Sequence, residues 1–205
     1  MFLRPLYRRP VTDKVTAESI IFITWAFYIT IKINSSLDIG NVLKAITENT
    51  VNILNVKGCT IFLLDRAGKK LIVGSSCGLS ENYVKKGPVD SEKSIVSTLS
   101  GEWVMISDVE NDNRIQYRDE AKEEGIASIL SVPMSVKGTI IGVLRIYISD
   151  SRTFSDIENE FISVLAEIGS IGIENARIYD HLKTEHEKLI HDVNRWFEFG
   201  VSHGK

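Results

Sequence analysis

The chain has 205 residues, of which 43% are hydrophobic and 25% are charged, and its formal net charge is −3. This composition is typical of a soluble globular protein, and an acidic balance without a basic stripe argues against nucleic acid as a partner. The two cysteines, Cys59 and Cys77, form no CxxC motif and no cluster with histidine. We therefore predict neither a structural zinc site nor a disulfide-stapled secreted fold, and a reducing, cytoplasmic location fits a free thiol pair.

The N-terminal segment combines a short basic tail with an apolar run. Residues 1–9 include three arginines and no acid, and the run IIFITWAFYITI follows at residues 20–31. Basic residues before an apolar run resemble a signal sequence, but this run is shorter than the ~20 residues of a membrane span. We expect a helix that other helices bury, and no membrane partner. Membrane anchoring or export is the alternative.

A helix and a hairpin follow. In residues 32–55 apolar side chains recur at helical spacing after Ser36 or Asp38, either of which can cap the helix. Residues 59–78 contain two apolar, β-branched runs around residues 65–68, which suit a tight turn. This order of elements predicts that the helix packs on the strands that come after it.

The rest of the chain completes an α+β pattern. The expected elements are a short helix at 91–101, a strand at 102–109, a polar segment with a helical tail that ends at Gly125, and a hairpin at 126–149 that turns at Lys137 and Gly138. A long helix covers 154–199, and Ser155 and Glu158 form a capping box at its start. Strand pairs flanked by helices predict a central antiparallel sheet with helices on one face.

The strand at 140–148 indicates what covers the other face. Alternation separates its side chains into two sets, Leu144, Ile146 and Ile148 on one face and Val143, Arg145 and Tyr147 on the other. A sheet that is apolar on both faces must be covered on both. Since only the crossover segment, roughly residues 79–128, remains for the second face, we predict that it forms a lid over an enclosed pocket.

Arg145 is the principal candidate site residue, because a buried arginine needs a partner. Its guanidinium can bind the carboxylate or oxyanion of a small anionic ligand. The alternative is an internal ion pair with an acid of the lid, which offers Asp108, Asp112, Glu120 and Glu124. In that case the chain would be a dimerisation scaffold with no ligand. The predicted ligand-binding residues are Thr60, Ser76, Ile95, Arg145 and Tyr147.

The cysteines offer a second hypothesis. If Thr60 faces Ser76 across the first hairpin, then Cys59 faces Cys77. Such a cross-strand pair can form a reversible disulfide, which would make the protein a redox sensor. The alternative is two buried thiols that pack as small hydrophobic side chains.

The last helix carries a heptad seam, because its seam positions step alternately by four and three residues. The seam consists of Phe161, Leu165, Ile168, Gly172, Asn175, Tyr179, Leu182, His186, Leu189, Val193 and Trp196. Beyond about Leu182 no domain remains for the seam to pack on, so we predict a parallel helical bundle between two copies; a frayed tail is the alternative.

His191 and Asp192 faintly resemble the phosphoacceptor motif H-D-x-x-N of sensor kinases, although a solvated surface is the simpler interpretation.

Segments across residues 34–182 resemble the GAF domain family. They are NSSLDIGNVLKAI, CTIFLLDRAGKKL, GLSENYV, ISDVENDNR, ILSVPMSVKGTIIGVLRIY and FSDIE…IGIENARIYDHL, in the family's order. The resemblance implies a small-molecule sensory module with a five- or six-stranded antiparallel sheet, a ligand under a lid and a homodimer formed through the terminal helices. We therefore predict three parts, a tail at 1–12, a GAF domain with its N-terminal helices at 13–182 and a helical extension at 183–205.

Three specialised versions of the family fit the chain poorly. Ile148 and Ser149 replace half of the cyclic-nucleotide signature, no cysteine has the context of a bilin attachment site, and all four histidines lie at or beyond His181, far from the lid. No cofactor can therefore be assigned. The chain also lacks the lid-side cysteines of the free methionine sulfoxide reductases, so we expect no enzymatic activity. The resemblance names neither the ligand nor the downstream signalling protein.

Overall fold

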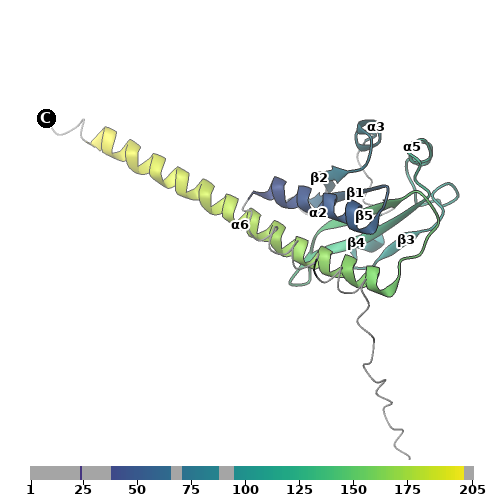
Figure 1. The fold of residues 1–205 in the computed structure, drawn as a ribbon. Coiled ribbons are helices and arrows are strands. Elements are labelled where there is room, and N and C mark those ends of the chain that lie inside the picture. The colour runs from purple at the N-terminus through teal and green to yellow at the C-terminus, as the bar shows by residue number, and fades with distance from the viewer. Residues whose placement is uncertain (1–23, 25–37, 66–70, 88–94, 201–205) are drawn as a thin grey trace, which may run out of the picture.

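The structure, a computed structural model, describes residue 24 and residues 38–65, 71–87 and 95–200. These ranges contain a five-stranded antiparallel sheet in the order β2-β1-β5-β4-β3 (Figure 1). The strands are β1 (Gly58–Leu64), β2 (Leu71–Cys77), β3 (Val104–Ile106), β4 (Ser128–Val136) and β5 (Thr139–Ile148). The helices are α2 (Ile39–Leu54), α3 (Glu81–Val84), α4 (Val96–Leu99), α5 (Arg118–Glu123) and α6 (Asp156–Gly200). The expected α+β class is confirmed, whereas the helix expected at 20–31 lies outside the described residues except for Thr24.

Helix α2 begins at one of the two predicted caps. Asp38 Oδ1 accepts a hydrogen bond from the backbone N–H of Asn41 at 3.0 Å, which satisfies one of the free donors of the first turn. The helix ends at Asn55, which has a left-handed φ of 49° and bonds back to the Val51 carbonyl. Between these ends, apolar residues such as Val42 and Ile46 are fully buried.

Both predicted hairpins are present. In the first, Thr60 pairs with Ser76 and Cys59 with Cys77, as the sequence predicts. The second turns at Lys137 and Gly138, whose φ angles of 50° and 79° are those of a two-residue turn that matches the twist of the strands. The pairing of β4 with β5 starts at this second turn, with Val136 opposite Thr139.

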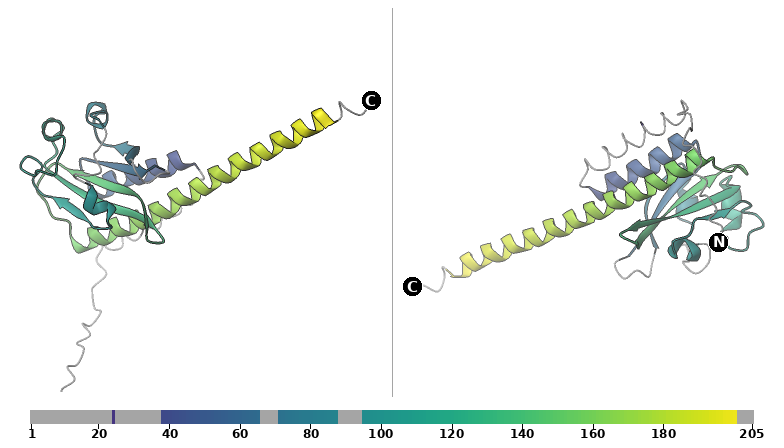
Figure 2. Two further views of the ribbon diagram at one scale, coloured as in Figure 1. Left: turned by 180° about the vertical axis from the view of Figure 1, so that it is seen from behind. Right: turned by 90° about the horizontal axis from the view of Figure 1, so that it is seen from below.

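Each face of the sheet has its own core. On one face α2 and α6 lie side by side (Figures 1 and 2) and bury strand residues that include Ile61, Val132, Leu144 and Ile146. On the other face a smaller core joins Ile129 and Tyr147 to residues of the crossover, Tyr83, Val109, Ile115, Ala121 and Ile126. The predicted alternation along β5 is therefore confirmed.

The crossover is more irregular than the sequence predicts. The strand expected at 102–109 is reduced to Val104–Ile106, because Asp108 Oδ1 accepts hydrogen bonds from the next backbone N–H groups, those of Glu110 and Asn111. Such a local turn competes with strand pairing. Within the described part of the expected helix at 91–101, only Val96–Leu99 is helical.

Helix α6 has two parts with different surroundings. Its first turn has the predicted capping box, since Ser155 N–H donates to Glu158 Oε2 at 2.8 Å and Glu158 N–H donates to Ser155 Oγ at 3.3 Å. The first part packs on the sheet, but every residue at positions 178–197 is exposed and the helix projects past the domain (Figure 1). Among the described helices, none combines the length and apolarity that a bilayer span needs.

Candidate ligand-binding site

Strand β5 carries Arg145 into the middle of the sheet. Its register partners are Thr60 on β1 and Ser131 on β4, and residues directly opposite each other share a face. Arg145 is only 5% exposed, and its Nε donates a hydrogen bond to Ser131 Oγ at 3.2 Å. The guanidinium is thus a buried cation between two hydroxyl side chains, on the face that the crossover covers.

Tyr147 lies two residues further along the same face and is fully buried. Its ring meets that of Tyr83 edge to face, with the ring centroids 5.6 Å apart. Burial raises the pKa of the Tyr147 hydroxyl, although the charge of Arg145 and a hydrogen bond with Thr60 act in the opposite direction. The phenol is therefore neutral at physiological pH and can donate a hydrogen bond.

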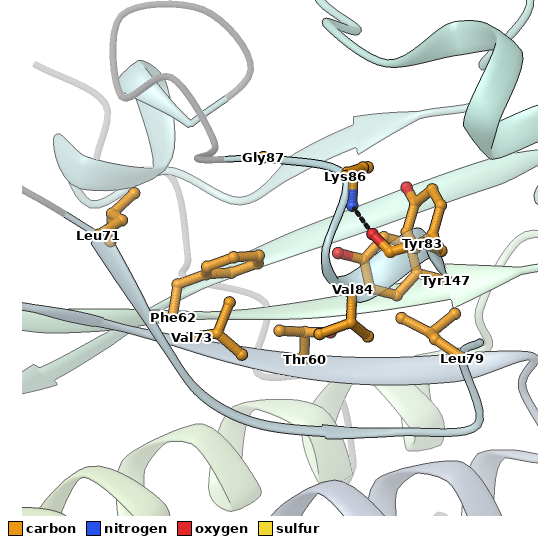
Figure 3. A pocket seen from close by; sticks show the side chains of 10 residues that line it. All are labelled: Thr60, Phe62, Leu71, Val73, Leu79, Tyr83, Val84, Lys86, Gly87 and Tyr147. Carbon is orange, nitrogen blue, oxygen red and sulfur yellow. Dashed lines mark hydrogen bonds between the residues drawn. The ribbon is translucent and has the colours of Figure 1, made fainter. Parts of the chain in front are cut away.

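A small cavity opens beside these residues. Its volume is about 40 Å³, and it is lined by Thr60, Phe62, Leu71, Val73, Leu79, Tyr83, Val84, Lys86, Gly87 and Tyr147 (Figure 3). A void of roughly 10–15 Å³ on this measure already accommodates one water molecule. The cavity is therefore large enough for a few water molecules or a ligand of few heavy atoms.

Lys86 brings a second cation to this cavity. Its Nζ donates to the backbone carbonyl of Tyr83 at 2.9 Å and lies 3.4 Å from the centroid of the Tyr83 ring. Burial, followed by the charge of Arg145, lowers the pKa of Lys86 to about 8, while Glu120 and Glu124 oppose this shift. The amine therefore stays largely protonated at neutral pH in surroundings that disfavour the charge.

Hydrogen bonds and one ion pair hold α3 and the residues after it, which carry Tyr83 and Lys86. Ser80 caps α3, because its Oγ accepts from the Tyr83 N–H at 3.2 Å. The carboxylate of Glu124, at the end of α5, accepts from the Ser80 N–H at 3.0 Å and from the Ser80 hydroxyl. Lys57 lies 3.6 Å from the same carboxylate. Through Glu124, the segment that carries Tyr83 and Lys86 therefore contacts the end of α5 and Lys57, which directly precedes β1.

Arg145 lines a second, smaller void of about 10 Å³ together with Ile115, Gln116, Tyr117 and Ile129. Tyr83 and Lys86 border both this void and the larger cavity. Lys86 and Tyr83 therefore stand between Arg145 and the larger cavity. The two cations face a common region under the crossover.

The structure brings only part of the predicted site together. Thr60 and Tyr147 line the larger cavity, and Arg145 lines the void beside it. Ser76 shares a 2.9 Å hydrogen bond with Thr60 but lines neither space, and the fully buried Ile95 lines neither as well. The sequence-based prediction missed Tyr83 and Lys86. The available signal was Ser80, a capping residue that begins a short turn carrying an aromatic and a basic side chain.

Three of the acids proposed as partners of Arg145 engage other groups. Asp112 pairs with Arg114, and Asp108 accepts from the side-chain amide of Asn111 at 2.7 Å. Glu124 accepts from Ser80, as described above. The pKa values of all three carboxyls lie below the usual range, as expected for ionised groups with donors nearby.

The two cysteines face each other as free thiols. Cys59 is fully buried among the apolar residues of the helix face, and burial raises its pKa far above the usual range, against a hydrogen bond with Thr50. Burial also raises the pKa of the more exposed Cys77. Both shifts disfavour the thiolate, the reactive form in disulfide chemistry.

Comparison with known proteins places this geometry in a family. The family model for the GAF domain matches residues 36–174. The methyl sulfide methyltransferase-associated sensor of Methanosarcina acetivorans is 29% identical over 138 residues, which are 64% of this chain but only 14% of that protein. The chain therefore spans a small fraction of that relative's length.

Solved structures share the fold. The GAF domain of a phosphoenolpyruvate-protein phosphotransferase from Coxiella burnetii superposes with a TM-score of 0.70 at 20% identity, covering 81% of this chain and 99% of that one. Free methionine-R-sulfoxide reductase from Neisseria meningitidis superposes with a TM-score of 0.65 at 15% identity, covering 80% and 95% respectively. The match of the family model and this common architecture agree, and the chain belongs to the GAF domain family.

Proposed function

We propose that the chain is a sensory module that binds a small anionic ligand under the crossover and transmits the binding event through a dimer of α6. One observation carries the proposal: two cations, Arg145 and Lys86, and the neutral hydroxyl of Tyr147 border small cavities on one face of the sheet, while α6 packs on the other face. The sensor-named relative supports a sensory role. Free thiols suit the cytoplasm as the place of action.

The projecting part of α6 supports self-association. Leu182, Leu189 and Trp196 are 61%, 63% and 71% exposed, and they occupy seam positions of the heptad pattern. Exposed apolar side chains along one side of a helix favour a partner that buries them, although His186 interrupts this seam between Leu182 and Leu189. A second copy of the same helix supplies a matching stripe. The proposed boundary between the domain at 13–182 and the extension at 183–205 lies within this continuous helix.

Strand β5 connects the two faces. Arg145 and Tyr147 point toward the cavities, whereas Leu144 and Ile146 pack in the same core as Phe161 and Leu165 of α6. A ligand that displaces β5 therefore changes the packing of α6. It can shift the arrangement of the helices only by the difference between its affinities for the two arrangements.

A redox sensor is the second candidate, favoured by the direct pairing of Cys59 with Cys77. Oxidation would join the two sulfurs in a disulfide, with peroxide as the oxidant that accepts the two electrons and leaves as water. Alkylation after peroxide treatment tests this candidate. Modification of both thiols would exclude it, whereas protection of both, reversed by a reductant, would support it.

Native mass spectrometry of the freshly purified protein tests the main proposal. We expect a dimer that carries an additional small mass, and we expect Arg145→Met to lose that mass while keeping the unfolding temperature of a folded domain. A monomer at micromolar concentration would contradict the dimer. A dimer without a bound mass, with no binding of any small anion in titrations, would favour a scaffold without a ligand.

A further inference from the structure

We propose that the 40 Å³ cavity binds a short-chain apolar monocarboxylate and that Lys86 holds its carboxylate. This inference rests on the proposed function and names the class of ligand and the anchoring residue. It follows from three properties of the cavity: a cation that pairs with no carboxylate of the described residues, a hydroxyl donor at the same end and an apolar wall at the other end.

The cation is the first property. Among the described residues, the contacts of Lys86 Nζ are a backbone carbonyl at 2.9 Å and the rings of Tyr83 and Tyr117, at 3.4 and 5.7 Å from the centroids. None of these is a carboxylate. The preceding residue differs, because the exposed Lys85 pairs with Glu81 at 2.8 Å. Within the described ranges, Glu120 and Glu124 act on this ammonium through their charge but form no ion pair with it. An anion in direct contact would therefore compensate the burial of the amine.

The donors are the second property. Thr60 and Tyr147 line the cavity together with Lys86, and Figure 3 shows Lys86, Tyr83 and Tyr147 at one end of it. The Thr60 and Tyr147 hydroxyls share a hydrogen bond, and Thr60 also bonds with Ser76, so these linked hydroxyls have at most one hydrogen left for a ligand in the cavity. Together with the Lys86 ammonium, that hydrogen provides one donor for each oxygen of a carboxylate. A phosphate has more oxygens and more charge to satisfy than these groups provide. The donor set therefore fits a monocarboxylate better than a phosphate.

The apolar wall is the third property. Phe62, Leu71 and Val73 lie at the opposite end of the cavity from Lys86 (Figure 3), and Leu79 and Val84 add further apolar surface. A purely polar anion would leave this surface without a partner, whereas an alkyl chain buries against it. The small volume restricts that chain to a few carbon atoms.

Gly87 explains how the chain can place Lys86 at this point. Its φ of +133° lies in a region that other residues rarely adopt, and an added Cβ would lie 2.5 Å from the Tyr117 hydroxyl oxygen. Glycine thus permits the close approach between the residue after Lys86 and Tyr117. The Lys86 side chain, the proposed binding group for the carboxylate, therefore lies between the rings of Tyr83 and Tyr117 and lines the cavity.

Isothermal titration of the full chain with sodium butyrate tests this inference, with 1-butanol and inorganic phosphate as probes that lack the charge or the apolar chain. We expect butyrate to bind at least about tenfold more tightly than either probe, as a charge-assisted hydrogen bond implies. Lys86→Met, which keeps most of the apolar stem, should weaken butyrate binding at least about tenfold. Lys85→Met is the matched control and should leave the affinity unchanged.

The possible failures are distinguishable. Equal butyrate affinity in the wild type and in Lys86→Met would overturn the role of Lys86. If butyrate does not bind but the native mass spectrum shows a different bound mass that Arg145→Met loses, the ligand class is wrong and the proposed function stands. If neither butyrate nor any retained mass is found, and no small anion binds in titrations, both proposals fail.

Discussion

The two faces of the sheet use adjacent residues of the same strand for different purposes. On the helix face, Leu144 and Ile146 are fully buried in an apolar core. On the crossover face, Arg145 and Tyr147 are just as inaccessible but present a charge and a hydroxyl to small cavities. The helix face is packed for stability, whereas the crossover face retains polar groups whose burial is costly.

The difference also extends beyond the sheet. Helix α6 continues past the domain and exposes apolar side chains there. The described helices of the crossover, α3, α4 and α5, are short by comparison. We infer that the helix face serves both folding and association. Substitutions on the two faces should therefore change different measured quantities.

The largest effect is expected in the helix-face core. Leu144→Ala removes a fully buried side chain and should lower the free energy of unfolding by about 2–5 kcal/mol through lost apolar burial and the cavity left behind. Urea denaturation monitored by circular dichroism measures this change. Thr139→Ala, at the exposed start of the same strand, is the control and should stay within about 0.5 kcal/mol. A loss below about 1 kcal/mol for Leu144→Ala would contradict the proposed role of this core.

The second largest effect is expected on self-association, at the exposed seam of α6. Leu189→Glu places a charge at an exposed seam position and should weaken self-association at least about a hundredfold, because the dimer would bury two unpaired charges. Sedimentation at micromolar concentration should then report a monomer whose domain unfolds as in the wild type. Thr184→Glu introduces the same charge outside the predicted seam and should leave the dimer intact. Loss of the dimer in both variants would indicate a general charge effect instead.

A smaller, pH-dependent effect is expected at Lys86. Its folded pKa of about 8 lies below the ordinary 10.5, so the unfolded chain binds more protons between these values and stability should rise as the pH increases from 8 to 10.5. Below pH 8 the folded protein carries the full cost of the charge. Lys86→Met should therefore be more stable than the wild type at pH 7, by about 1 kcal/mol, which is well below the value that the pKa shift alone implies because solvent screens the partly exposed amine. This advantage should disappear near pH 10.5.

The comparison between variants isolates Lys86 from its titratable and charged neighbours. Arg145, Tyr83, Tyr117, Glu120 and Glu124 surround the amine and are unchanged in both proteins. Unfolding in urea at pH 7, 9 and 10.5 measures the difference, with Lys85→Met as a control that should follow the wild type. A constant difference between Lys86→Met and the wild type at all three pH values would show that lost packing, rather than the charge, explains the effect.

Sequence patterns were sufficient for the fold but not for the complete site. The alternation along β5, the capping box at Ser155 and the turn at Lys137 and Gly138 are local signals, and each corresponds to an observed feature. The position of Lys86 depends instead on contacts between distant segments, among them the tie between Ser80 and Glu124 and the approach of Gly87 to Tyr117. Periodicity within one element carries no information about such contacts.

In the first hairpin, the sequence predicts the pairing near Thr60 but not the register of the rest of β2. Ser76 pairs with Thr60 as predicted, but Gly74 has no partner because the pairing shifts between Ile61 and Phe62. This irregularity, a β-bulge, changes which side chains of β2 follow the face of Thr60. Leu71 and Val73 consequently share the face of Phe62 and line the cavity with it.

The smallest expected effect follows from that arrangement. Ser76→Ala removes the partner of the Thr60 hydroxyl at 2.9 Å and should lower the free energy of unfolding by about 0.5–1.5 kcal/mol, the net contribution of one hydrogen bond. Butyrate affinity should change less than twofold, because Ser76 does not line the cavity and Thr60 remains. Urea denaturation and isothermal titration measure the two quantities on the same sample. A loss of affinity as large as that of Lys86→Met would mean that Ser76 orients the Thr60 hydroxyl toward the ligand, so that the polar end of the cavity reaches the edge strand.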